Sequence, residues 1–147
     1  MNKGLFIEEI LLNSVELLLS GRVNELLGEM EYSVPPIEFG SYRGGSVVVP
    51  IISLSTCEQT EKERIVRLDA YTLTVTFAVP ERPGGERNCY AYAASAATAL
   101  KEDPTLGGMA DRAELTGKKY TPPKQNGTGG QWEVELKIHV LIEEAGV

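Results

Sequence analysis

The chain has 147 residues, a length typical of one domain that can bury a substantial hydrophobic core. Hydrophobic residues make up 42% of it and charged residues 24%, proportions that exclude a collagen-like or wholly disordered chain. The formal net charge of −7 argues against general nucleic-acid binding, because an acidic protein repels phosphate groups. We therefore expect a single domain over residues 1–147.

Cysteine and histidine are scarce, since Cys57, Cys89 and His139 are the only residues of these two types. A structural zinc site normally takes four such ligands, so we expect no metal site and two reduced thiols. Glu8 and Glu9 stand where a signal peptide has its apolar core, and no apolar run reaches the length of a membrane span. The sequence predicts a cytoplasmic protein without a membrane segment.

The first predicted element is a helix over residues 5–30, in which apolar residues recur along one stripe. Gly21 predicts a break in it or a division into two helices. Residues 31–45 combine prolines and glycines without any periodicity, so we expect a long loop or arm there. Apolar and arginine side chains of this arm and of the loop over 80–87 have no evident partner within the domain. We assign the following to contacts with other subunits or with a partner: Ile37, Phe39, Tyr42, Arg43, Arg82 and Arg87.

Two strands are predicted next. Residues 46–54 are rich in β-branched side chains, and Pro50 places this strand at a sheet edge or at a bulge. A polar turn over residues 58–63 leads to a second strand over 64–79, whose apolar residues alternate with threonines. The apolar pattern changes parity near Asp69, which predicts a bulge or bend there.

An alanine-rich helix is predicted over residues 88–102, capped at its start by Asn88 and ended by Asp103-Pro104. The core face expected for this helix consists of Tyr90, Ala93, Ala94, Ala97 and Leu100.

Two further strands, over residues 109–121 and 131–143, flank a loop over 121–130. In the last strand the side chains expected to face inward are Trp132, Val134, Leu136, Ile138, Val140 and Ile142. The fold class predicted is α+β: an antiparallel or mixed sheet of about four strands, packed by an N-terminal helix and a central alanine-rich helix.

Candidate chemical groups do not combine into a known motif. His139 falls on the polar face of its strand, without a nucleophile or an orienting partner nearby in the pattern. The glycine-rich segment 103–108 follows a helix, whereas phosphate-binding loops precede one. Lys118 and Lys119 form a basic pair that we interpret as a solvated strand end. We expect no catalytic residue, no cofactor and no metal.

Several segments of the second half of the chain resemble one protein family. They are Tyr90-Ala91-Tyr92-Ala93-Ala94, Asp103-Pro104-Thr105-Leu106-Gly107-Gly108, Ala113-Glu114-Leu115-Thr116-Gly117, Trp132-Glu133-Val134-Glu135-Leu136 and the terminal Ile142-Glu143. Together they resemble the tail terminator (tail completion) proteins of long-tailed bacteriophages and prophages. In that family a helix ends in a turn of this D-x-T-L-G-G type and a pair of strands follows. The resemblance covers about residues 64–143.

The resemblance implies a structural virion protein rather than an enzyme. Such proteins form a hexameric ring that caps the tail tube, ends its polymerisation and faces the head connector. Implied partners are therefore other copies of the chain, the tail tube protein and the connector, with DNA passing through unbound. The implied location is the host cytoplasm during assembly and then the virion tail. In such a ring we expect Glu58, Glu61 and Glu63 to line the lumen, because negative charge does not trap phosphates.

Three alternatives stay open. The chain could be another tail or neck component, such as a tube or head–tail connector protein. It could be an enzyme or a small-ligand-binding α+β domain that uses Asp69, His139 and the Lys118–Lys119 region, which requires a pocket with converging polar groups. It could also be an α+β domain that binds another protein.

Overall fold

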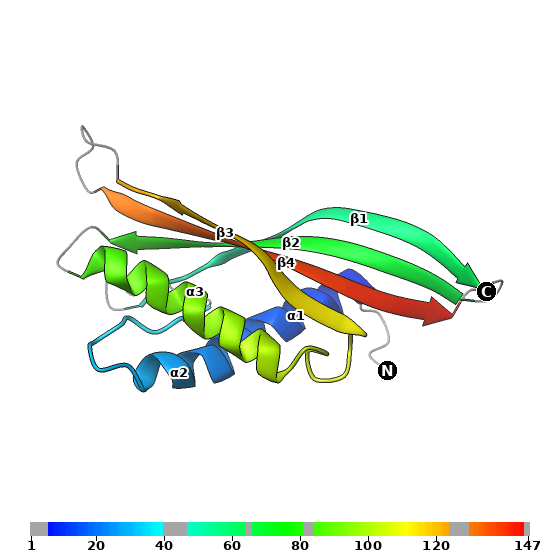
Figure 1. Ribbon diagram of the computed structural model, residues 1–147, viewed down its shortest axis with the longest axis horizontal. Coiled ribbons are helices and arrows are strands. Elements are labelled where there is room, and N and C mark those ends of the chain that lie inside the picture. The colour runs from blue at the N-terminus through cyan, green and yellow to red at the C-terminus, as the bar shows by residue number, and fades with distance from the viewer. Residues whose placement is uncertain (1–5, 40–46, 64–65, 81–83, 124–129, 146–147) are drawn as a thin grey trace.

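A computed structural model describes residues 6–39, 47–63, 66–80, 84–123 and 130–145 of the chain. Within these ranges four antiparallel strands form one sheet, and the helices lie on one side of it (Figure 1). In chain order the elements are α1 (Ile7–Leu18), the π-helical turn η1 (Leu19–Val23), α2 (Asn24–Gly28), β1 (Ile51–Glu63), β2 (Val66–Pro80), α3 (Gly85–Glu102), β3 (Arg112–Thr121) and β4 (Gln131–Ala145). The predicted α+β class is confirmed, with an antiparallel sheet, an N-terminal helix and an alanine-rich helix.

The sheet has the order β1-β2-β4-β3, so β1 and β3 are its edge strands. Pro50 immediately precedes β1, which confirms that the proline marks a sheet edge. The polar turn predicted over residues 58–63 is wrong, because β1 stays paired with β2 as far as Glu63. A polar segment is compatible with an edge strand, whose backbone is paired on one side only.

The core side of the sheet follows the predicted alternation. In β2 and β4 the fully buried side chains are Tyr71, Leu73, Val75, Phe77, Val79, Val134, Leu136, Ile138 and Val140, and Trp132 is half-buried against them. The bulge predicted near Asp69 is wrong, since β2 pairs with β4 without a register shift. Asp69 instead continues the core-facing row and is buried, so the change of pattern marks a buried acid. The shifts lie in the edge strands, between Leu54 and Thr56, between Glu61 and Glu63, and between Leu115 and Gly117.

Around Gly21 the N-terminal helical segment divides into two α-helices, which confirms the second alternative of the prediction, and the helical backbone is not broken. It continues through η1, a single π turn, into α2. Its buried residues recur every four positions: Leu11, Val15, Leu19, Val23 and Leu27. A spacing of four drifts around an α-helix of 3.6 residues per turn, and the wider π turn brings the stripe back toward the sheet.

Helix α3 begins three residues earlier than predicted. Gly84 precedes it with φ of 88°, a left-handed conformation that suits glycine, and Asn88 lies inside the helix instead of capping it. A Cβ on Gly85 would come within 2.7 Å of the carbonyl oxygen of Pro80, so the helix start packs too closely for any side chain. The predicted end at Glu102, just before Asp103-Pro104, is confirmed.

The predicted core face of α3 is wrong for Tyr90 and Ala94, which are exposed, and for Ala97, which is half-buried. Tyr92 fills the core instead, with its ring stacked on Phe77 at a centroid distance of 5.1 Å. The buried side of the helix comprises Asn88, Cys89, Ala91, Tyr92, Ala93, Ser95, Ala96, Ala99 and Leu100. Because alanines occur on nearly every side of this helix, the sequence does not indicate which side faces the core.

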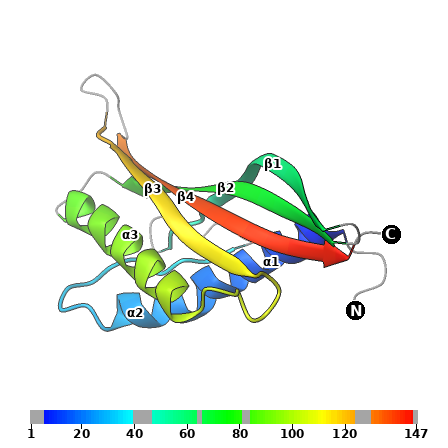
Figure 2. The same cartoon turned by 45° about the vertical axis from the view of Figure 1, so that its right-hand side comes forward.

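Figure 2 shows α1, α2 and α3 on the same side of the sheet from a second direction. Within the described residues, no helix combines the length and the apolar character that crossing a membrane requires.

Candidate functional site

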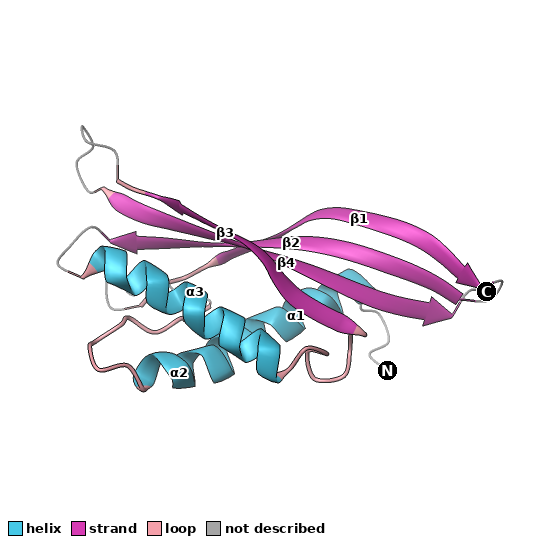
Figure 3. Cartoon of the chain, viewed as in Figure 1, coloured by secondary structure: helices cyan, strands magenta, loops and turns pink. Residues whose placement is uncertain are grey.

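One face of the sheet carries no helix among the described residues (Figure 3). Its central strands present Thr72, Thr74, Thr76, Glu133, Glu135, Lys137 and His139, which alternate with the buried core residues. Threonine and charged side chains tolerate water, so this open face suits contact with solvent or with an aqueous channel.

The residues of the proposed enzyme alternative do not converge. Asp69 is buried on the helix-covered face, whereas His139 lies on the open face opposite Thr72. Lys118 and Lys119 belong to the edge strand β3, at the level of Leu136 and Glu135 of β4. The sheet itself therefore separates the acid from the histidine, and no common pocket can use both.

The glycine-rich segment after α3 folds into a compact turn. The carboxylate of Asp103 accepts hydrogen bonds from the backbone N–H of Gly107 at 3.0 and 3.1 Å, and the Thr105 hydroxyl accepts one from Gly108 at 3.2 Å. Leu106, Gly107 and Gly108 all have positive φ values, which is why two glycines follow one another here. The segment is a connecting turn that hydrogen bonds to its own side chains hold together.

This turn also covers the beginning of β3. The carbonyl oxygen of Pro104 accepts a hydrogen bond of 2.6 Å from the backbone N–H of Ala113, on the side of β3 that faces away from β4. From Leu115 onward, no described segment pairs with that side of β3. The free part of this edge therefore extends from Leu115 to Thr121.

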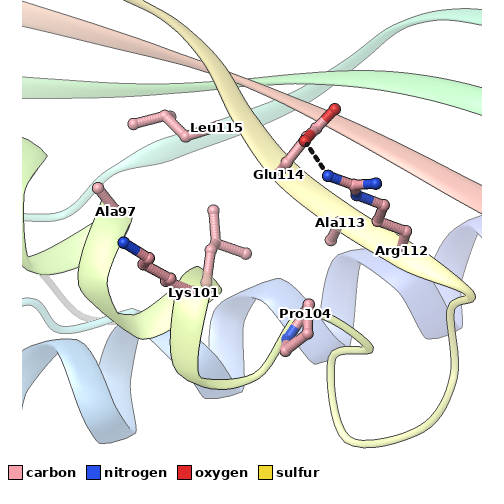
Figure 4. Close-up of a pocket in the computed structure, with 8 residues that line it drawn as sticks. Ala97, Lys101, Pro104, Arg112, Ala113, Glu114 and Leu115 are labelled. Atoms are coloured by element: carbon pink, nitrogen blue, oxygen red, sulfur yellow. Dashed lines mark hydrogen bonds and ion pairs between the residues drawn. The ribbon is translucent and has the colours of Figure 1, made fainter.

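A groove of about 330 Å³ runs beside this edge, between α3 and β3 (Figure 4). Ala97, Leu100 and Leu115 give it apolar walls, and Lys101 lies at its rim. Arg112 forms an exposed ion pair of 3.1 Å with Glu114, also at the rim. An edge strand beside an apolar groove is a geometry that accepts an additional strand.

The other edge of the sheet, along β1, is also unpaired on its outer side within the described residues. Ile51 is 70% exposed, and Ile52 and Leu54 are half-buried. The nearest additional pairing is a single bridge between Ile37 and Val48, which precedes β1. Among the described residues the sheet therefore ends in two edges with unpaired segments, and the β1 edge carries an exposed apolar side chain.

The predicted interface residues of the arm divide into two groups. The prediction that Ile37 contacts a partner is wrong, because its side chain is buried in the core. The Asn24 side chain accepts a hydrogen bond from the Ile37 N–H and donates one to the Ile37 carbonyl, both at 2.7 Å. Phe39 is half-buried against the same core. Tyr42 and Arg43 of the arm, and Arg82 of the 80–87 loop, lie outside the described residues.

Arg87 is exposed, and its guanidinium lies 4.0 Å from the centre of the Tyr32 ring. It belongs to an aromatic cluster at the start of α3 that the sequence analysis did not identify. Tyr90 is 49% exposed and meets Tyr120 edge-on at 5.3 Å, beside a hollow lined by Trp132. Tyr90, Tyr120 and Trp132 come from α3, β3 and β4, so only the order of strands in the sheet brings these aromatic residues together.

Of the three glutamates expected at a ring lumen, Glu58 is exposed and pairs with Ala70, a position on the open face of the sheet. The side chains of Glu61 and Glu63 lie outside the described part of the chain. Both residues belong to β1 and not to a turn.

Cys89 is a residue of α3, and its thiol is buried in the core. Burial raises the pKa of this thiol to about 11. The side chain of Cys57 lies outside the described residues.

Comparison with known protein families finds no family model that matches the chain, and comparison with curated proteins finds no match either.

Proposed function

We propose that the chain is a structural subunit of a bacteriophage tail, which assembles into a ring on the end of the tail tube. The observation that supports this most strongly is a sheet with helices on one face, a polar open face and two free edges. A subunit of this kind can stand side by side with copies of itself, helices outward and polar sheet inward. Heterologous contacts of that type close into rings when the rotation between subunits is right.

In the proposed ring the open face lines the channel. Glu58 then contributes negative charge to the wall, together with Glu133 and Glu135 of β4. Acidic side chains repel the phosphates of passing DNA and keep it from sticking. Glu61 and Glu63 are proposed to extend the same wall toward one end of the ring.

The proposed partners are the tail tube protein beneath the ring and the head connector above it. Phe39, Tyr42, Arg43, Arg82 and Arg87 remain our proposed contact residues. Arg87 and the neighbouring Tyr90 are of the types that dominate protein interfaces. The proposed role is non-catalytic, confined to the host cytoplasm during assembly and then to the virion tail.

The test of this function is to interrupt the gene in the phage or prophage that encodes the chain and to measure tails by electron microscopy. We expect tails of irregular, excess length that do not join heads, and rescue by the wild-type gene supplied in trans. Tails that are absent altogether indicate a tube protein, and normal particles contradict the proposal. A Glu58→Lys/Glu61→Lys/Glu63→Lys variant that restores infectivity fully would contradict the acidic lumen.

A further inference from the structure

We infer that copies of the chain associate by pairing the free edge of β3 in one copy with the free edge of β1 in the next. This inference rests on the proposed ring only for closure, since the contact itself follows from the sheet. The four strands alternate in direction, so the two edge strands run in opposite directions. When two copies stand side by side with the same orientation, β1 of the second is therefore antiparallel to β3 of the first, and the sheet continues in the same antiparallel sense.

The register within one copy shows which residues meet. Ser53 pairs with Thr74, Thr74 with Lys137 and Lys137 with Gly117, so Ser53 and Gly117 lie at one height on opposite edges. A rotation about an axis along the strands brings Ser53 of one copy opposite Gly117 of its neighbour.

The same tracing places Leu54 at the height of Leu115, through Leu73 and Ile138. Both leucines face the helix-covered side and are half-buried in a single copy. Pairing the edges joins them into one apolar row and covers part of the groove beside α3. Removal of these apolar side chains from water favours the contact.

On the open face of the sheet, the residues of the β1 edge also complement those of the β3 edge. Ile51, which is 70% exposed, lies at the height of Lys119, through Thr76 and Glu135. The aliphatic stem of a lysine can cover such a side chain while its ammonium group stays in water.

Glu58 lies at the height of Arg112, through Ala70 and Leu141, and both are exposed on the open face. Their charges are opposite, so the contact joins an acidic position of one copy to a basic position of the next. This complementarity favours a second copy of the chain as the occupant of the edge, in head-to-tail order.

The length of the new ladder is limited at the same place on both edges. On β1 the bulge at Ser55 follows Leu54, and its hydroxyl bonds the carbonyl of Thr72 at 2.9 Å. On β3 the Pro104 carbonyl already occupies the N–H of Ala113. The regular segment 51–54 therefore meets the free segment 115–119, which has its own bulge at Thr116. Beyond these segments the backbones are not expected to pair, and only side chains such as Glu58 and Arg112 face each other.

The test is site-directed cross-linking of the full chain in a Cys57→Ser background, with a short bifunctional thiol reagent. Ser53→Cys replaces an exposed residue, and a Cβ at Gly117 would lie 3.8 Å from its nearest neighbour, an ordinary contact. We expect neither Ser53→Cys nor Gly117→Cys to cross-link by itself, and a mixture of the two to give dimers only. The double variant Ser53→Cys/Gly117→Cys should give a ladder of covalent oligomers.

Ser53→Cys combined with Thr121→Cys is the matched control. Position 121 lies four residues from position 117 along β3, about 13 Å away, so this pair should not react. Circular dichroism of each variant at low concentration verifies that the monomer is folded, which separates a lost contact from a lost fold.

Each possible result either supports or overturns the edge contact. Cross-linking of Ser53→Cys alone indicates a two-fold β1–β1 contact and overturns the inference, as does a chain that stays monomeric at high concentration. A ring mass in light scattering without cross-linking overturns the edge contact and leaves the proposed function intact. A ladder that grows without limit supports the edge contact and overturns the closed ring.

Discussion

Arg22 and Glu102 lie 80 residues apart in the chain and are joined by two hydrogen bonds of 2.7 and 3.1 Å. This ion pair links the π turn η1 to the last turn of α3, so it connects the two helical segments that pack under the sheet. The hydrogen bond from Arg22 lowers the pKa of Glu102 below its ordinary value of 4.5. Both groups are partly exposed, so the link positions the helices more than it stabilises them.

The ion pair predicts a pH dependence. Because the pKa of Glu102 is lower in the folded chain, the pair stabilises the fold above about pH 4.5, and this contribution is lost as the pH falls through the folded-state value. Urea unfolding of wild type and Glu102→Gln should therefore show a small difference at pH 7 that shrinks as the pH falls below about 4.5. Glu133→Gln, at an exposed position of β4, is the control and should show no such trend. A difference that grows on acidification would contradict the pairing.

A second prediction concerns two tyrosines of α3. The Tyr92 hydroxyl donates a hydrogen bond of 2.6 Å to the carbonyl of Pro35, whereas the exposed Tyr90 donates one of 2.7 Å to Glu86. Tyr92→Phe should reduce the free energy of unfolding by about 1 kcal/mol, because it leaves a partly buried carbonyl without this donor. Tyr90→Phe should change it by less than about 0.5 kcal/mol. Equal effects of the two changes in urea unfolding would refute this assignment.

The third prediction concerns the Asn24 side chain, which bonds both backbone groups of Ile37 and holds the residues after the helix against the core. Asn24→Ala should cost about 1–3 kcal/mol of stability, because a buried donor and acceptor lose their partners. Hydrogen exchange at the Ile37 amide should accelerate in this variant. Asn13→Ala removes the same side chain from an exposed position of α1 and should leave that exchange unchanged. Unaltered exchange in Asn24→Ala would show that the clamp is not needed.

Cys89 provides a fourth prediction. Its pKa of about 11 and its burial keep the thiol protonated and inaccessible at neutral pH. In a Cys57→Ser background, iodoacetamide should label the native chain slowly at pH 8 and label the urea-unfolded chain quickly. Unfolded chains form the thiolate near pH 9, so stability should also fall as the pH rises from about 9 to 11. Rapid labelling of the native chain would contradict a core position.

Strands β2 and β4 were predictable because each has one buried and one open face, which produces a period of two. The extent of β1 was not predictable, because an edge strand with polar residues at successive positions has the same sequence pattern as a polar turn. The π turn was not predictable either, because Gly21 signals a break with equal strength. The parity change near Asp69 predicts a bulge or bend, because an acidic residue in a core-facing row of a strand has no sequence signature of its own.

The candidate edges and the aromatic cluster depend on sheet order, which the sequence does not contain. Ser53 and Gly117 are 64 positions apart, and only the pairing of three strand boundaries places them at one height. The resemblance in the second half supplied the hypothesis of a ring, and the strand pattern supplied the sheet. Neither indicated the two sheet edges as surfaces through which copies could pair.

The proposed ring is tested most directly by the mass of the native assembly, measured by light scattering after size exclusion over a concentration series, with and without divalent cations. We expect one discrete species near six times the chain mass of 16.0 kDa, unchanged when the concentration rises further. A polymer whose mass keeps rising with concentration would contradict a terminating ring and favour a tube protein. A monomer at every concentration would contradict self-association through the sheet edges.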